Sequence, residues 1–358
     1  MAGDPRGTTR GIALRAGDFF STFSLLGLII AVAALFAYFK YKLPDTFLTF
    51  TNIETIAKQA TITSMASLGM TLIIISAGID LSIGSGVALI TVVIALSLQH
   101  HAGWFAILIA LIAGAAMGLF NGTVISKVNV SPFIVTLGTL LMFRGLAREF
   151  GHDTTVSSPD TWINNLFNVL GPNEHWKLFP LGVWFMLAMA AGTGILLRRT
   201  VFGRHVVAIG SNETAARMSG VNVERVKISV YVLGGIAIAL AGTMQFSRLS
   251  VGDPTVAVGF ELDVIAAVVI GGASLNGGQG SILGSLIGAV FMTTIQNGFA
   301  QLGWPESYRI YITGAIIIFA VALDQRRQGK TSWLGLGMLV LTLGAIGYVM
   351  FDWYPSLK

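Results

Sequence analysis

The 358-residue sequence contains no cysteine, and few of its residues carry a charge. Without cysteine the chain can form no disulfide, no thiolate metal site and no cysteine nucleophile. Charged residues make up 11% of the chain and hydrophobic residues 54%, which leaves too little charge for the surface of a soluble protein of this length. The net charge of +5 is typical of lysine and arginine in cytoplasmic loops and does not indicate nucleic-acid binding.

The sequence also lacks the signatures of an enzyme. The five histidines fall in loops without metal-ligand spacing, and no catalytic serine elbow is present. The only Gly-Lys-Thr triplet is Gly329-Lys330-Thr331, and a phosphate-binding loop would need glycine where Asp324 stands. We therefore predict no catalytic residue, no metal site and no cofactor in this chain. An integral membrane enzyme is disfavoured, and any ATPase that drives transport is another polypeptide.

Long apolar runs dominate what is present. A bilayer core about 30 Å thick needs about 20 apolar helical residues to cross it, and continuous rather than alternating runs favour helices over a barrel. We predict an all-α polytopic membrane protein with a retained first helix. The eleven expected spans are 19–39, 55–77, 81–98, 104–125, 132–147, 180–197, 227–247, 258–272, 281–300, 308–323 and 333–351.

The distribution of lysine and arginine orients these spans. Segment 198–227 is strongly basic and is predicted to be cytoplasmic, whereas segment 148–179 is acidic and is predicted to be external. Both assignments agree with a cytoplasmic N-terminal tail, 1–18, and with the eleven-span count. The expected transmembrane permease domain covers 19–325, and 333–351 is an additional C-terminal helix.

The chain shows a weak internal repeat at an offset of 176 residues. At this offset Asn121-Gly122 aligns with Asn297-Gly298, and the run 133–143 aligns with 309–319. The offset pairs spans two to five, about 55–147, with spans seven to ten, about 227–323. Because it covers an odd number of spans, the two units would be inverted in the membrane, an arrangement that recurs in transporters.

A polar segment between spans two and three contains Asp80, Ser82 and Ser85, with Gly78 and Gly84 as expected breaks in helical structure. A charge at membrane depth is costly and usually faces a cavity or a partner. Asp80 therefore either caps the third span or lies on a solute pathway or its gate. The amides of Asn121, Gln296 and Asn297 suit either helix–helix contacts or the pathway.

Two further segments stand out near the ends of spans. The glycine-rich run 270–281 predicts a tight turn or broken helix, with breaks at Gly271, Gly272, Gly277 and Gly278. Glu261 and Asp263 either line an external mouth or cap the eighth span.

The cytoplasmic segment 198–227 predicts one short exposed helix. Asn212 or Ser211 can cap its start and Gly220 can end it. Such a helix is either a docking element or an ordinary connector.

Three motifs together closely resemble the permease subunits of bacterial monosaccharide ABC importers of the ribose, galactose, xylose and arabinose type. The motifs are Ala77 to Ser85, Gly210 to Val221, and Val268 to Ser281, and the resemblance runs from about 45 to 325. It implies a type II importer fold in a bacterial inner membrane. It also implies three partners: a second permease subunit, an ATPase with tandem nucleotide-binding domains that holds ATP and Mg, and a periplasmic sugar-binding protein.

The same resemblance implies roles for individual residues. The Asp80 motif would lie near the translocation route or its gate. The helix Asn212–Gly220 would couple the permease to the ATPase; its residues include Asn212, Glu213, Ala215, Ala216, Arg217, Ser219 and Gly220. The extra C-terminal span departs from the usual ten.

Two alternatives remain beside sugar import. The same architecture could carry a branched-chain amino acid, a nucleoside or a signal molecule. Alternatively, an ion-coupled secondary transporter would use Asp80 as its coupling carboxylate.

Overall fold

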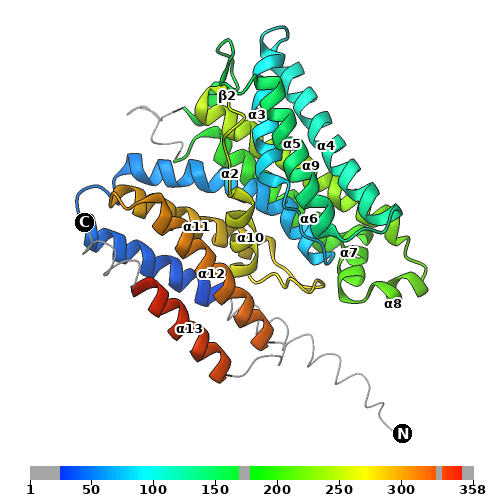
Figure 1. Ribbon diagram of the computed structural model, residues 1–358. Helices are drawn as coiled ribbons and strands as arrows, with labels where there is room; N and C mark the ends of the chain where they lie inside the picture. Colours follow the sequence, from blue (N-terminus) through cyan, green and yellow to red (C-terminus); the bar gives the residue numbers. More distant parts are fainter. Residues whose placement is uncertain (1–24, 169–177, 328–332, 349–358) are drawn as a thin grey trace, which may run out of the picture.

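The computed structural model describes residues 25–168, 178–327 and 333–348, and it is almost entirely helical (Figure 1). The predicted tail 1–18, the first residues of the span 19–39 and the last residues of the span 333–351 lie outside this part. The helices are Leu25–Lys42, α2 (Phe50–Ile75), α3 (Ile83–Leu98), α4 (Gly103–Lys127), α5 (Pro132–Gly151), α6 (Leu181–Arg199), α7 (Val201–Ser211), α8 (Glu213–Met218), α9 (Val223–Leu249), α10 (Phe260–Ile270), α11 (Ile282–Gln301), α12 (Glu306–Arg327) and α13 (Trp333–Tyr348), with a short 3₁₀ helix at Asn164–Phe167.

Each of the eleven predicted spans coincides with a helix, which confirms the polytopic helical class. By length and composition, six of the described helices could cross a membrane: Leu25–Lys42, α4, α6, α9, α11 and α12. The predicted additional C-terminal helix is also present as α13, which packs against α12.

The molecule has two distinct ends. The only strands in the described residues, β1 (Val156–Ser157) and β2 (Val251–Gly252), pair antiparallel at one end, which we call the ribbon end. The helices α7 and α8 lie at the opposite end, which we call the α8 end (Figure 1). The helix α9 connects the two ends, since it begins just after α8 and finishes just before β2.

The helices α2–α5 and α9–α12 form two units with the same order and opposite directions. Two contacts place the C-terminus of α2 at the α8 end. The carbonyl of Ile75 accepts a hydrogen bond from the Gly278 amide at 2.8 Å, and Gly210 of α7 packs directly on that carbonyl. Thus α2 ends where α9 begins. The predicted inverted repeat is present in the fold, with α2 and α9 of nearly equal length at 26 and 27 residues.

One helix in each unit is too short to cross a bilayer. At 1.5 Å per residue, α3 is about 24 Å long and α10 about 16 Å, against a hydrocarbon core of about 30 Å. The loop before α3, 76–82, is mostly buried, whereas the loop before α10, 250–259, has exposed residues such as Thr255 and Val258. Loop 250–259 runs along α3, because Thr91 of α3 accepts a hydrogen bond from the Asp253 amide at 3.1 Å.

Both loops are held by the same type of turn. Asp80 Oδ1 accepts hydrogen bonds from the amide and hydroxyl of Ser82, at 2.8 and 2.6 Å. Asp253 Oδ1 accepts the equivalent pair from Thr255, at 2.8 and 2.7 Å. Such side-chain bonds replace backbone partners that a helix would supply. The two units therefore share the same type of turn before their short helix, in addition to the same order of helices.

The predicted glycine breaks divide into two kinds. Gly272, Gly277 and Gly278 have φ of +93°, +85° and +76°, so they form the tight turn expected between α10 and α11. Gly84 is not a break, because it lies within the first turn of α3. It permits close approach instead: a Cβ there would stand 2.4 Å from both the Ala257 carbonyl oxygen and Glu261 Oε2.

Gly78 and Gly271 are required for close packing rather than for a positive φ. A Cβ on Gly78 would meet the Tyr231 hydroxyl at 2.6 Å, and one on Gly271 would meet the backbone of Gly284 at 2.4 Å. Gly78 also lies in the loop 76–82, so a break in helical structure is present there as predicted.

Replacing Gly84 with alanine is expected to destabilise the protein. Overpacking of this kind typically costs about 1–3 kcal/mol, because loop 250–259 must move away from α3. Thermal unfolding of the purified protein in detergent measures the effect. The matched control is Gly138→Ala in α5, where a Cβ would meet nothing within 4 Å. Equal melting temperatures for the two variants would contradict the close contact.

Candidate functional site

The predicted pathway residues fall into two separate places. Asp80, Ser82, Ser85 and Asn121 come together near the α8 end, and all four are buried. Gln296 and Asn297 lie instead on the wall of a cavity that opens nearer the ribbon end. The structure therefore does not bring the six residues into one site.

The first group forms a hydrogen-bonded turn ahead of α3. Asn121 of α4 donates to the Ser82 hydroxyl at 3.1 Å, and that hydroxyl donates to Asp80. Ser85 donates to the Ser82 carbonyl at 3.0 Å. Asp80 thus fixes the entry to α3, which is close to the cap alternative, although it bonds Ser82 rather than an amide within the helix.

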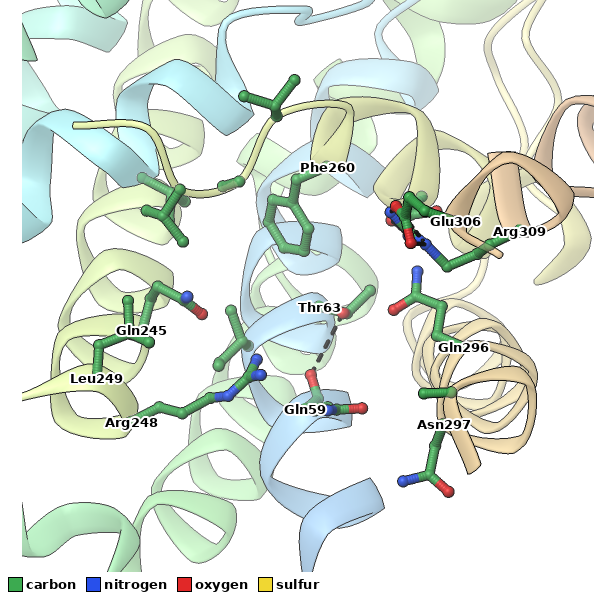
Figure 2. A pocket seen from close by; sticks show the side chains of 17 residues that line it. Gln59, Thr63, Gln245, Arg248, Leu249, Phe260, Gln296, Asn297, Glu306 and Arg309 are labelled. Atoms are coloured by element: carbon green, nitrogen blue, oxygen red, sulfur yellow. Dashed lines mark hydrogen bonds and ion pairs between the residues drawn. The ribbon is translucent and has the colours of Figure 1, made fainter. Parts of the chain in front are cut away.

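The cavity has a volume of about 480 Å³ and lies between α2, α9, α10, α11 and α12 (Figure 2). Loop 250–259 and Val87 of α3 complete its lining. Its polar lining residues, from five helices, are Gln59, Thr63, Gln245, Arg248, Asp263, Gln296, Asn297, Glu306 and Arg309. A small-molecule site commonly has this size and a few polar groups among apolar ones.

One wall carries hydrogen-bonding groups without protein partners. Arg248 and Gln245 extend from α9 toward Gln59 of α2 (Figure 2). Within the described residues Arg248 makes no ion pair. The Oε1 of Gln59 has no hydrogen-bond partner there either, but it is buried away from the accessible space of the cavity. This wall therefore offers a cationic donor.

The opposite wall carries a compact charged cluster. Arg309 of α12 lies 3.5 Å from Asp263 of α10, and its Nε donates to Glu306 at 2.8 Å. Gln296 of α11 lines the cavity beside this cluster (Figure 2). Asp263 is thus part of the cavity wall rather than only a helix cap, and both carboxylates are held by one guanidinium.

Asn297 joins two helices at the edge of the cavity. Its amide donates to Asn52 of α2 at 3.0 Å, and Asn52 donates to the Phe47 carbonyl at 2.7 Å. Gln301 donates to Asn297 at 3.1 Å. Asn297 therefore makes a helix–helix contact between α11 and α2, and it also lines the cavity.

Sequence reasoning missed Gln59, Thr63, Gln245, Arg248 and Phe260 as cavity residues. Gln59 and Thr63 are four residues apart on α2, Gln245 and Arg248 are three apart on α9, and Phe260 is the first residue of α10. Arg248 is the penultimate residue of α9, so from sequence it resembles a cation at the membrane interface. The one available signal was that polar side chains in apolar helices tend to face a cavity.

The short helix predicted at Asn212–Gly220 is present as α8, and its role in coupling stays a prediction. Asn212 Oδ1 accepts the Ala215 amide at 2.9 Å, and Gly220, with φ of +84°, lets the Val221 amide bond the Ala216 carbonyl. Ala216 is buried against the protein, whereas Met218 is 86% exposed. Ala215, Arg217 and Ser219 are exposed as well.

An ion pair fastens α8 to α9. Glu213 contacts Lys227 of α9 at 2.7 Å and Arg217 at 3.1 Å. The hydrogen bond from Lys227 is the main cause that lowers the pKa of Glu213 below its ordinary value. The carboxylate is therefore charged at neutral pH, and its stabilising contribution is lost only as the pH falls through that lowered pKa.

Comparison with known proteins gives a consistent result. A family model described as branched-chain amino acid transport system / permease component matches residues 52–321. The ribose import permease protein RbsC of Escherichia coli is 37% identical over 307 residues, covering 85% of this chain and 94% of that protein.

Two other relatives are similarly covered. RbsC of Bacillus subtilis is 36% identical over 327 residues, covering 89% of this chain and 95% of that protein. The L-arabinose ABC transporter permease protein AraH of Azospirillum brasilense is 35% identical, covering 85% and 88%. No solved structure matches the chain.

Two substitutions of Asp80 distinguish the contribution of its hydrogen bonds in the turn from the contribution of its negative charge. Asp80→Ala leaves the Ser82 amide and hydroxyl without their buried acceptor, at a cost of about 1–3 kcal/mol. Asp80→Asn keeps an acceptor oxygen and is expected to cost less. Thermal unfolding in detergent ranks the two variants, and an Asn variant as unstable as the Ala variant would contradict the turn assignment.

Proposed function

The chain belongs to the branched-chain amino acid transport system / permease component family, and on that premise we propose that it is the membrane-spanning permease subunit of an ATP-binding-cassette importer for a monosaccharide. The observation that carries the proposal is what the similar proteins are named, together with how much of this chain they cover. Proteins named as ribose and L-arabinose permeases match at least 85% of this chain. A match to only part of the chain would be weaker support for a shared function than these matches over most of its length.

The α8 helix supports the second part of the proposal. In this view the α8 end is cytoplasmic, and α8 docks on a separate ATPase that holds ATP and Mg. Positive charge on α7 and α8, including Arg204 and Arg217, agrees with this orientation. As part of the same proposal, the N-terminus lies in the cytoplasm of a bacterium and the chain lies in its inner membrane.

The ribbon end would then face the periplasm and receive sugar from a binding protein. ATP binding and hydrolysis in the partner move α8, and the permease alternates between outward and inward openings. A second permease subunit completes the assembly. This chain contributes the pathway and the docking surface, and the covalent chemistry belongs to the ATPase.

Ion coupling through Asp80 is the rival mechanism. Asp80 accepts two hydrogen bonds from Ser82, which gives it a structural role that does not need proton transfer. Under the importer proposal, the carboxylate is replaceable by an amide.

Changes on the exposed face of α8 are expected to release the ATPase. Met218→Glu and Arg217→Glu alter side chains that project from the protein, so they should abolish co-purification of the ATPase while leaving the permease folded. The control is Asp153→Lys at the ribbon end, whose side chain is 78% exposed. The proposal is wrong if the wild-type chain carries no ATPase under any condition.

Sugar uptake by the Asp80→Asn importer tests the mechanism. We expect uptake that still requires ATP and stays close to the wild-type rate, because the turn is preserved. Uptake into proteoliposomes with ATP inside measures it. Loss of transport without loss of stability, together with ATP-independent uptake by the wild type, would support ion coupling instead.

A further inference from the structure

We propose that the cavity between α2, α9, α10, α11 and α12 binds one neutral polyhydroxylated ring in transit, and that Arg248 anchors its hydroxyl groups, an inference that rests on the importer function given above. The cavity thereby acts as a selective site and not only as a passage. The guanidinium of Arg248, the charge balance of the walls and the apolar surface of the cavity each support the assignment.

The guanidinium of Arg248 on the α2–α9 wall matches hydroxyl chemistry. It presents several N–H donors in a planar fork, with no ion pair in the described part of the chain. A sugar hydroxyl accepts hydrogen bonds without carrying a charge, so two neighbouring hydroxyls of one ring can bind the fork.

The charges of the cavity favour a neutral solute. On the far wall Arg309 contacts both Asp263 and Glu306, which leaves one negative charge in excess there. Arg248 supplies one positive charge on the near wall. The four groups sum to zero, so a solute with a net charge would unbalance them in a partly desolvated space.

A zwitterionic amino acid is the competing solute class. Its carboxylate could pair with Arg248, and its ammonium group could join the Arg309 cluster, where two carboxylates share one guanidinium. Protection by L-leucine in the test below is therefore the result that would assign the cavity to amino acids.

The remaining surface suits the C–H face of a ring. Phe260 lies over the cavity between its two walls (Figure 2), and Ile62, Val87 and Val256 also line it. Small-molecule sites typically combine such apolar surface with a few placed polar groups. A volume of about 480 Å³ is sufficient for one small ring together with water.

A single introduced thiol tests the site directly, because the chain has no cysteine of its own. Ala300→Cys places a small reactive group on the cavity lining. In the assembled importer without nucleotide, labelling by a small methanethiosulfonate is followed with D-ribose, L-arabinose, D-xylose or D-galactose in large excess. At least one sugar should slow labelling severalfold, whereas L-leucine and D-glucuronate should not.

Arg248 variants in the same background assign the anchor. Arg248→Ala should remove protection by sugar, and Arg248→Lys should retain only part of it, because lysine lacks the fork. The matched control is Arg148→Ala, an exposed arginine at the ribbon end, which should leave protection unchanged. A second control, Ala102→Cys, carries an exposed thiol at the same end, and no sugar should protect it.

The outcomes distinguish failure of the site from failure of the importer function. If no sugar slows labelling of the Ala300→Cys protein while the ATPase still co-purifies, the cavity assignment is overturned and the importer function stands. Protection by leucine alone overturns the neutral-ring class. Protection that survives Arg248→Ala overturns the anchor.

Discussion

The fold depends on turns that precede two short helices, in which an aspartate accepts the amide and hydroxyl of a residue two positions ahead. Lipid offers no hydrogen bonds to a backbone, so membrane-spanning segments are normally complete helices. Here α3 and α10 are short, and each follows a loop that such a turn holds. The turn of Asp80 and Ser82 is buried, whereas the turn of Asp253 and Thr255 is exposed. In both loops the side-chain bonds replace backbone partners that a helix would supply.

Much of this architecture could be predicted from sequence, for a clear physical reason. A backbone that crosses a bilayer has no water to bond, so it must form long apolar helices. Such helices appear in the sequence as long apolar runs. The bounds of α8 were equally accessible, because Asn212 caps its start and the left-handed Gly220 ends it. Gly84 was misassigned, since its reason is contact with Ala257, far away in the chain, and not local conformation.

The cavity was less predictable, because its members come from separate helices. Gln59 and Arg248 lie on α2 and α9, and nothing in either local sequence indicates the other. Asp263 could be expected at a helix start, but its contact with Arg309 depends on how α10 and α12 pack. Patterns along a chain predict that a polar side chain avoids lipid. They do not predict which side chain faces it across a cavity.

The helix α9 joins the α8 end of the molecule to the ribbon end as one continuous helix. Near its start Lys227 is paired with Glu213 of α8, and near its far end Gln245 and Arg248 form one wall of the cavity. Its 27 residues span about 40 Å, and no proline interrupts them. A stiff element transmits a tilt at one end as a displacement at the other. A movement of α8 would therefore displace Gln245 and Arg248 in the cavity wall directly through α9, without a chain of side-chain contacts between the two ends.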